Sequence, residues 1–380
     1  MKVAIMMRVM DQPSGYGFFA ENLVDTMLRL EPGISFVLFY RTSKWVGRFS
    51  SFKNVKEIQV WAPHKLAWDQ VAVPYRAWVE KADVILNPKF TVPLFSRCPV
   101  TMCLMEPAWW AWPEHYEWWD VKYMKLMLPL YLRKAAHLFP WCNFHVEEMR
   151  KYLRLPLNNF TITPPAPRNE FRVIEDAQAL EEFRVSHQLP RRFLVVVTRV
   201  DHIGNDKRTF FCGKNVETAL RAFNLCKKDI PHDLVIAGRD VREYLSQTGW
   251  NGEDLERVHC TGFLPAQDLV KLLNLADLFV QPSFYEGFGM AQLEAMASGC
   301  PVIASRTGAC SELAAGSAIL ADPYRPEDFA EKILRVLNHE DHRKEMRTKG
   351  LERASDFDWE KTARLVLEGL TKVVESSNDP

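Results

Sequence analysis

Residues 281–302 read Gln-Pro-Ser-Phe-Tyr-Glu-Gly-Phe-Gly-Met-Ala-Gln-Leu-Glu-Ala-Met-Ala-Ser-Gly-Cys-Pro-Val. They continue the apolar run of residues 278–281, which predicts a buried strand. A helix is expected next, over residues 289–298, because Gly299 and Pro301 are residues that end helices. The stretch therefore predicts a strand, a loop and a helix of an α/β protein.

Two glutamates in this stretch are candidates for ligand binding. Glu286 falls in the loop after the strand, and Glu294 falls on the helix that follows. The first-turn backbone amides, at Gly289 and Met290, present the positive end of the helix dipole to the same region. Amides suit anionic oxygens and carboxylates suit sugar hydroxyls, so this arrangement fits a polyol attached to a diphosphate.

Strand-like and helix-like segments alternate on both sides of this stretch. Strands are expected at residues 2–7, 34–40, 84–86, 100–105, 193–197, 234–237, 278–281 and 302–304, and helices at 17–30, 216–226, 268–275, 289–298 and 326–338. This alternation builds parallel sheets with helices on both faces. In such sheets, ligands bind at the carboxyl ends of the strands.

Length and composition predict two domains. The chain has 380 residues, more than one hydrophobic core usually supports. Three prolines in residues 163–168, Thr-Pro-Pro-Ala-Pro-Arg, prevent a helix or a central strand from continuing and mark a hinge. Basic and acidic residues number 20 and 14 before residue 167, and 28 and 34 from there on, so the halves differ in charge.

Charge, hydropathy and cysteine spacing exclude several classes of protein. Lys and Arg total 48 and Asp and Glu total 48, so no basic balance indicates nucleic-acid binding. The apolar run at residues 1–7 is too short for a signal peptide, and no window reaches about 18 uninterrupted apolar residues, which predicts a cytoplasmic protein. The eight cysteines include no Cys-x-x-Cys or Cys-x-x-His pair, so we expect reduced thiols and no zinc site.

Residues 15–20, Gly-Tyr-Gly-Phe-Phe-Ala, have the glycine spacing of a dinucleotide fingerprint. That fingerprint turns tightly off its strand, whereas here residues 8–14 separate the first strand from Gly15. We therefore favour a glycine loop that opens a helix over a nicotinamide site. In such a loop, Gly15 and Gly17 let backbone amides approach an anion closely.

The central stretch also resembles a known family. Glu286 to Glu294, followed by Ala-Ser-Gly-Cys-Pro-Val-Ile-Ala at residues 297–304 and Gly-Ala-Cys-Ser-Glu at 308–312, resembles the E-x7-E region of retaining glycosyltransferases of family four. Further pieces follow in that family's order: the strand ending at Arg199, Gly213-Lys214-Asn215, residues 235–238, residues 262–264 and Phe357-Asp358-Trp359. The resemblance is close over residues 185–365 and general elsewhere. It implies an α/β protein of GT-B architecture, in which two Rossmann-like domains with parallel sheets face each other across a cleft.

The resemblance places most of a nucleotide-sugar donor site in the C-terminal domain. It implies that Arg199 and Lys214 neutralise the donor diphosphate, so that neither a metal nor a cofactor is expected. It also implies that Glu286 faces the donor sugar and is catalytic together with this cation pair. The donor-binding residues that it implies are Glu294 at the ribose, Gly15 and Gly17 at the diphosphate, Gly238, Phe263 and Leu264 at the base, and Phe288, Gly289 and Met290 at the sugar hydroxyls.

One departure from the family concerns the reaction centre. Many relatives have His-Asp after the strand equivalent to residues 100–104, whereas this chain has Met105-Glu106-Pro107. Glu106 either takes a catalytic, polar role near the reacting sugar or is a buried or capping carboxylate, and His115 is a weaker replacement. The acceptor can also rely on the donor phosphate as its base, as in the front-face mechanism proposed for retaining transferases.

Five tryptophans lie within residues 109–119, directly after this loop. Three interpretations stay open. Trp109, Trp110 and Trp112 stack on the sugar rings of an acceptor, or the tryptophans form a membrane-interface patch with nearby lysines, or they pack in the core. Pro113 argues against one continuous helix through the segment.

The sequence thus predicts a metal-independent retaining glycosyltransferase that moves a hexosyl unit from a GDP- or UDP-sugar to a hydroxyl of a carbohydrate or glycolipid. Its expected domains are an acceptor-binding domain at 1–166, a nucleotide-sugar-binding domain at 167–355, and a C-terminal helix at 356–380 that crosses back to the first domain. The expected location is cytoplasmic, with peripheral contact at the inner face of the membrane as an option. Two alternatives are a non-catalytic sugar-nucleotide-binding module and a sugar-nucleotide epimerase.

Overall fold

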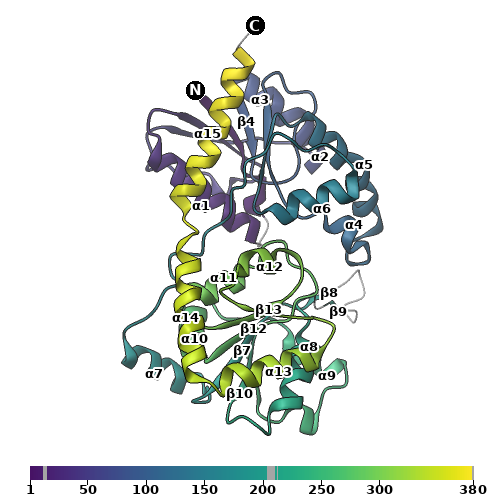
Figure 1. Cartoon of the computed structure of the whole chain (residues 1–380). Coiled ribbons are helices and arrows are strands. Elements are labelled where there is room, and N and C mark those ends of the chain that lie inside the picture. Colours follow the sequence, from purple (N-terminus) through teal and green to yellow (C-terminus); the bar gives the residue numbers. More distant parts are fainter. Residues whose placement is uncertain (12–14, 203–209, 212, 379–380) are drawn as a thin grey trace. The chain divides into compact units, whose positions relative to one another are not determined.

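The computed structural model describes residues 1–11, 15–202, 210–211 and 213–378 (Figure 1). The chain divides into two compact units. Unit 1 comprises Met1–Pro165 together with Asp358–Pro380, and unit 2 comprises Ala166–Phe357. Each unit is built on a six-stranded sheet with helices packed on it, which confirms the expected α/β class.

The sheet of unit 1 has the strand order β3-β2-β1-β4-β5-β6, and its neighbouring strands pair in parallel. The strands are β1 (Lys2–Met6), β2 (Ser35–Tyr40), β3 (Val55–Gln59), β4 (Val84–Asn87), β5 (Val100–Leu104) and β6 (His137–Pro140). Val3 of β1 pairs with Phe36 on one side and with Val84 on the other. The chain therefore extends the sheet first on one side of β1 and then on the other, which makes the end of β1 the topological switch point.

Short and long helices cover this sheet. They are α1 (Gly15–Leu30), α2 (Lys65–Ala67), α3 (Val73–Val79), α4 (Ala108–Ala111), α5 (Trp118–Lys134) and α6 (Asn143–Leu153), with single turns η1 (Met7–Asp11), η2 (Ser43–Trp45), η3 (Trp68–Ala72) and η4 (Pro113–His115). The tryptophan segment is broken as expected, because Pro113 begins a new turn between α4 and α5.

The last helix, α15 (Trp359–Asn378), belongs to unit 1 and lies along α1 (Figure 1). The Trp359 ring packs against Phe18 and Phe19, each with ring centroids 5.8 Å apart. A side chain at Gly369 would place its Cβ 2.6 Å from a ring carbon of Phe139. Only glycine at that position lets the helix approach β6 so closely.

The sheet of unit 2 has the strand order β11-β10-β7-β12-β13-β14, again with parallel neighbours. The strands are β7 (Phe193–Val197), β10 (Asp233–Ala237), β11 (Val258–Gly262), β12 (Leu278–Gln281), β13 (Val302–Ser305) and β14 (Ile319–Ala321). A short antiparallel pair, β8 (Asp201–His202) and β9 (Phe210–Phe211), stands apart from it. The switch point of this sheet lies between β7 and β12.

The helices of unit 2 are α7 (Ala177–Ser186), α8 (Val216–Cys226), α9 (Val241–Gln247), α10 (Ala266–Leu275), α11 (Met290–Ala297), α12 (Gly308–Ala314), α13 (Pro326–Leu337) and α14 (Glu340–Ser355), with one turn, η5 (Gly252–Leu255). Phe193, Phe223 and Phe329 are fully buried, and the last two share one hydrophobic core with strand residues such as Leu194. The large buried aromatic side chains anchor the strands whose ends carry the candidate site.

Candidate active site

The candidate site of unit 2 lies at the carboxyl ends of β7 and β12. Arg199 follows β7 by two residues, and the loop of residues 282–289 joins β12 to α11. These two strands are neighbours in the sheet, with Leu278 paired to Leu194. Parallel neighbours end at the same edge, so the chain brings Arg199 and Glu286 to one side of unit 2.

Lys214 and Glu286 form an ion pair within this site. The Lys214 Nζ donates to Glu286 Oε1, and the Ser283 hydroxyl donates to the same oxygen at 2.8 Å. Burial acts to lower the pKa of Lys214, but the charge and hydrogen bond of Glu286 outweigh it, so the pKa is raised. Lys214 therefore carries its positive charge throughout the neutral range.

Asn215 fixes the loop that carries Lys214. Its backbone is left-handed, with φ 55°, a conformation that asparagine tolerates better than most residues. Its buried side-chain amide donates to the carbonyls of Pro282 and Pro323, each at 2.8 Å. One side chain thus ties the start of α8 to the loop that carries Glu286.

Glu294 meets a cation that sequence reasoning did not select. The Arg168 Nε donates to Glu294 Oε1 at 2.8 Å, and the Arg168 guanidinium lies 4.5 Å from the Phe171 ring centroid. Glu294 is only 6% exposed, and burial raises its pKa although the charges of Arg168 and Lys214 lower it. Arg168 is the last residue of the segment 163–168, which its prolines led us to interpret only as a hinge.

Electrostatic coupling joins the four predicted charged residues. The charge of Arg199 acts on the pKa of Lys214, and the charge of Lys214 acts on the pKa of Glu294. With the Lys214–Glu286 ion pair, these couplings place two cations and two carboxylates in one region of unit 2.

The turn before α11 has a conformation suited to glycine. Gly289 has φ 94° and caps the helix, whose first residue is Met290. Phe288 is 5% exposed and packs edge-on against Phe357, with ring centroids 5.8 Å apart. The Phe288 ring is therefore part of the core, so any contact of Phe288 with a ligand falls to its backbone, whereas the Met290 side chain is half-buried.

A pocket of unit 2, of about 820 Å³, is lined by residues of the segment after β10, of α9 and of β11, including Gly238 and Gly262. The Gly238 amide donates to the Gly262 carbonyl at 2.9 Å. A Cβ at Gly238 would lie 2.1 Å from the Thr198 carbonyl oxygen, so only glycine fits there. Phe263, which directly follows Gly262, is 66% exposed, and the Arg239 guanidinium lies 5.5 Å from its ring centroid. The next residue, Leu264, is half-buried.

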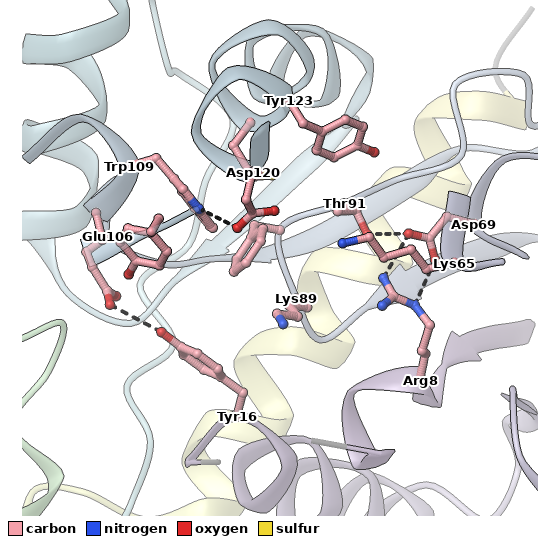
Figure 2. A pocket seen from close by; sticks show the side chains of 14 residues that line it. Arg8, Tyr16, Lys65, Asp69, Lys89, Thr91, Glu106, Trp109, Asp120 and Tyr123 are labelled. Carbon is pink, nitrogen blue, oxygen red and sulfur yellow. Dashed lines mark hydrogen bonds and ion pairs between the residues drawn. The ribbon is translucent and has the colours of Figure 1, made fainter. Parts of the chain in front are cut away.

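The remaining predicted residues lie in unit 1. Gly15 and Gly17 form the first turn of α1, directly after residues 12–14, which lie outside the described residues. Glu106 follows β5 and accepts a hydrogen bond from the Tyr16 hydroxyl at 3.2 Å (Figure 2). The side chain of His115 lies outside the described residues.

A buried histidine stands behind Glu106. His145 Nε2 lies 3.7 Å from Glu106 Oε2, and His145 Nδ1 lies 3.0 Å from the Leu104 carbonyl oxygen. A carbonyl oxygen only accepts, so Nδ1 carries a hydrogen and Nε2 faces the carboxylate. His145 was not predicted, because it comes from α6 and meets Glu106 only through the fold.

The tryptophans after Glu106 occupy three different environments. Trp109 is 7% exposed, donates from Nε1 to Asp120 Oδ2 at 3.2 Å and packs edge-on against Phe90. Trp110 and Trp112 are half-buried. At the start of α5, Trp118 and Trp119 are 68% and 49% exposed.

Unit 1 also contains a pocket of about 260 Å³ beside Glu106 (Figure 2). Charged, hydroxyl and aromatic side chains line it, and they come from η1, α1, α2, η3, α4, α5 and the segment after β4. Its lining residues are Arg8, Tyr16, Lys65, Asp69, Lys89, Phe90, Thr91, Glu106, Ala108, Trp109, Tyr116, Asp120, Tyr123 and Met124.

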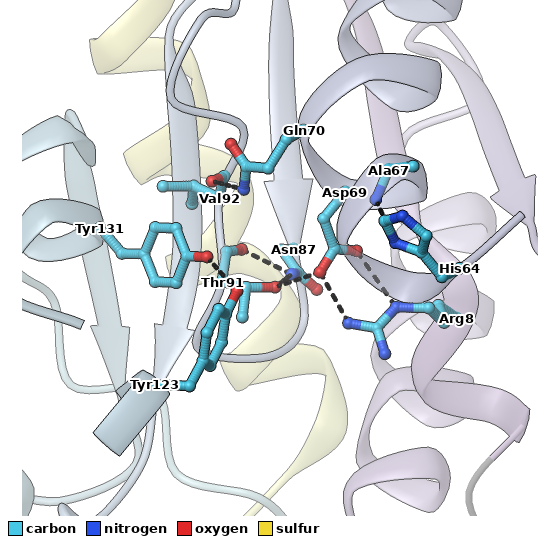
Figure 3. A network of polar contacts seen from close by, with 10 residues as sticks. All are labelled: Arg8, His64, Ala67, Asp69, Gln70, Asn87, Thr91, Val92, Tyr123 and Tyr131. Carbon is cyan, nitrogen blue, oxygen red and sulfur yellow. Dashed lines mark hydrogen bonds and ion pairs between the residues drawn. The ribbon is translucent and has the colours of Figure 1, made fainter. Parts of the chain in front are cut away.

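A polar network forms one side of this pocket (Figure 3). Arg8 donates to both Asp69 oxygens, at 3.1 and 2.8 Å, and the Thr91 hydroxyl lies 3.4 Å from Asp69. The Asn87 side chain donates to the Thr91 carbonyl at 2.6 Å and to its hydroxyl at 2.9 Å. Burial raises the pKa of Asp69, while Arg8 opposes that effect.

The described part of the chain has neither a metal-binding cluster nor a membrane-spanning helix. Within the ranges given above, no group of three or more His, Cys, Asp or Glu side chains is arranged to hold a metal ion. None of the helices in the same ranges is both long and apolar enough to cross a membrane.

Comparison with known proteins shows which family the C-terminal part of the chain resembles. Residues 208–353 match the family described as Glycosyl transferases group 1. This match shows a similarity to that family over less than half of the chain. The chain is 25% identical over 253 residues to the serotype-specific mannosyltransferase WbdA of Escherichia coli, a match covering 65% of this chain and 30% of WbdA. It is 27% identical over 260 residues to the O-antigen chain mannosyltransferase B of Escherichia coli, covering 65% of this chain and 64% of that protein.

The chain thus spans less than two thirds of the length of these relatives. Among solved structures, Anabaena HepE in complex with UDP and glucose is similar, with a TM-score of 0.70 at 16% identity, over 98% of this chain and 100% of that one. The expected family and the expected GT-B fold are confirmed.

Proposed function

We propose that this chain is a retaining, metal-independent glycosyltransferase that moves a hexosyl unit from a nucleoside diphosphate sugar to a hydroxyl of a carbohydrate or glycolipid. The match of residues 208–353 to the group 1 family supports glycosyl transfer, and the two matched relatives are named mannosyltransferases. The observation that carries the proposal is the Lys214–Glu286 ion pair beside Arg199, at the switch point of the unit 2 sheet.

In this proposal unit 2 binds the donor. Arg199 and Lys214 neutralise the diphosphate, which removes the need for a divalent metal, because two fixed cations stabilise the negative charge that grows on the leaving group. Glu286 accepts hydrogen bonds from the donor sugar, and the amides of residues 288–290 orient its hydroxyls. Glu294 binds the ribose. The pocket of Gly238 takes the base of the GDP- or UDP-sugar, with backbone groups as its main contacts.

The proposed reaction needs only the atoms of the donor and the acceptor. The bond between the donor C1 and the diphosphate oxygen breaks, and the acceptor hydroxyl oxygen bonds to C1 on the same face. The hydroxyl proton passes to the leaving diphosphate. Lys214 is positively charged before this step because its pKa is raised, so its charge is available to the leaving diphosphate.

Unit 1 is the proposed acceptor side, with Glu106 as its polar group nearest the tryptophan segment. The Tyr16 hydroxyl donates a hydrogen bond to one oxygen of the Glu106 carboxylate, and His145 Nε2 lies 3.7 Å from the other. The exposed start of α5 is the proposed peripheral contact with the inner face of the membrane. There, Lys122 Nζ lies 4.9 Å from the Trp118 ring centroid, and tryptophan and lysine together favour the interface.

Product analysis tests the proposal. The full chain is incubated with GDP-mannose, UDP-glucose or UDP-N-acetylglucosamine and a panel of methyl glycosides, and the products are read by mass spectrometry and NMR. We expect a new glycosidic bond with the anomeric configuration of the donor, without added metal. Binding without hydrolysis or transfer would instead indicate a sugar-nucleotide-binding module. An altered sugar nucleotide formed without an acceptor would indicate an epimerase.

A further inference from the structure

The charged side chains that line the pocket beside Glu106 restrict the kind of acceptor that it can bind. Its six charged side chains are three cations, Arg8, Lys65 and Lys89, and three carboxylates, Asp69, Glu106 and Asp120. The formal charge of the lining is therefore zero. A phosphorylated ligand would lose its hydration there without meeting a net positive field.

The cations of the lining already have neighbours within unit 1. Arg8 makes a two-pronged ion pair with Asp69. The Lys65 ammonium lies 5.4 Å from the Trp119 ring centroid, and the Lys89 ammonium lies 5.0 Å from that of Phe90. Each of the three cations thus already has a carboxylate or an aromatic ring as a neighbour within unit 1.

Charges of both signs act on Lys89 itself. Burial is the main cause that lowers the pKa of Lys89 to about 8, and the charge of Arg8 adds to it. Asp120 and Asp69 act in the opposite direction. The surroundings of this ammonium thus contain hydrogen-bond acceptors as well as positive charge, the mixture that sugar hydroxyls satisfy because each hydroxyl donates and accepts.

One carboxylate of the lining is positioned by an aromatic side chain. Trp109 Nε1 donates to Asp120 Oδ2 at 3.2 Å, and Trp109 packs against Phe90 at 4.7 Å and Tyr116 at 5.5 Å between ring centroids. The other oxygen, Oδ1, has no partner among the residues that the structure describes. The pocket therefore combines an aromatic wall with an oriented acceptor, as sites for sugar rings do.

The volume limits the ligand to a small group. The pocket measures about 260 Å³. Sites for drug-sized ligands begin at about 300 Å³. One pyranose ring fits this pocket, and a longer oligosaccharide extends beyond it.

We propose that this pocket binds the terminal, uncharged pyranose of the acceptor, with Lys89 and Asp120 as its hydroxyl-binding side chains. The inference rests on the proposed function and adds to it the chemical class of the acceptor. The aromatic wall of Trp109, Phe90 and Tyr116 lies against the ring.

Ligand binding by the full chain tests this inference without requiring turnover. Ligand-observed NMR compares a panel of methyl pyranosides of mannose, glucose, galactose and N-acetylglucosamine with the 6-phosphates of the same sugars. We expect at least one uncharged pyranoside to bind, and its 6-phosphate to bind at least 10-fold more weakly. Tighter binding of a phosphate, or no binding by the whole panel, would overturn the inference.

Two isosteric variants locate the binding. Lys89→Met and Asp120→Asn should each weaken pyranoside binding at least 10-fold, whereas the exposed control variants Lys53→Met and Asp25→Asn should not. Unchanged binding in both test variants would refute the assignment to this pocket. Donor hydrolysis without acceptor, measured in the two control variants, should match that of the unaltered chain. If the unaltered chain and both controls hydrolyse no donor, that result counts against the proposed function, whereas the binding measurements still test the assignment to this pocket.

Discussion

The Arg168 guanidinium lies 2.8 Å from the Glu294 carboxylate in unit 2 and joins the segment after the proline hinge to α11. Both side chains are largely removed from water, with 28% and 8% of their side-chain surface exposed. A buried carboxylate with a single cationic partner depends strongly on that partner. The ion pair therefore couples the fold of unit 2 to its proposed ribose contact.

Glu294 should make the stability of the chain depend on pH. Burial raises its pKa above the unfolded value of about 4.3, so the folded state binds its proton more readily than the unfolded state does. The free energy of unfolding of the unaltered chain should fall, relative to that of Glu294→Gln, as the pH rises from about 4 through the folded-state pKa. Urea unfolding at several pH values measures it. The exposed control Glu352→Gln should follow the unaltered chain, and a parallel curve for Glu294→Gln would contradict the prediction.

Tyr16 should support turnover through Glu106. Tyr16→Phe removes the hydroxyl that donates to Glu106 Oε1, a hydrogen bond worth about 0.5–1.5 kcal/mol. We expect transfer to fall about 2- to 10-fold, the rate equivalent of that energy, with donor hydrolysis unchanged. Tyr75→Phe, at a 62% exposed position of unit 1, serves as the control. Equal transfer by both variants would show that the orientation of Glu106 does not matter.

Gly238→Ala should damage both the fold of unit 2 and nucleotide binding. The new Cβ would lie 2.1 Å from the Thr198 carbonyl oxygen, so β10 or the end of β7 must move. Overpacking of this kind costs about 1–3 kcal/mol. We expect a melting temperature lower by several degrees and a weaker thermal shift with UDP or GDP. Gly33→Ala, where the added Cβ meets nothing within 4 Å, should leave both values unchanged. An unaltered melting temperature for Gly238→Ala would refute the close approach.

Trp118 and Trp119 should mediate membrane contact. They are 68% and 49% exposed at the start of α5. The double variant Trp118→Ser and Trp119→Ser should reduce co-sedimentation with vesicles of phosphatidylglycerol and phosphatidylcholine, because it removes the interfacial side chains but no charge. Trp61→Ser, at a 78% exposed position, is the matched control. Equal sedimentation of the double variant and the unaltered chain would assign these tryptophans another role.

The sequence predicted the centres of both sheets and missed their edges. Phe193–Val197 and Leu278–Gln281 were placed at their observed bounds, because strands covered on both faces read as apolar runs. The unpredicted strands β3, β6, β11 and β14 are the outer strands of the two sheets. They are short or half-exposed, as β3 with Lys56 and Glu57 illustrates, so their hydropathy gives no such signal.

The candidate site shows a similar division. The order of motifs along the chain was enough to predict four charged residues of the candidate site, Arg199, Lys214, Glu286 and Glu294. Arg168 and His145 were not predicted, because each meets its partner only through the fold. The pocket of unit 1 is of the same kind: its lining comes from segments spread over residues 8–124, with no local motif.

Lys214 provides the most direct test of the central claim. The measurement is the acceptor-independent hydrolysis of a nucleotide sugar by Lys214→Met, beside Lys228→Met at an exposed position of the same unit. Removing a cation that stabilises the developing charge on the diphosphate should lower the rate about 10²- to 10³-fold, with the rate of the control unchanged. Circular dichroism confirms that both variants are folded. A folded Lys214→Met variant that hydrolyses the donor at the unaltered rate would contradict the proposed role of the Lys214–Glu286 pair.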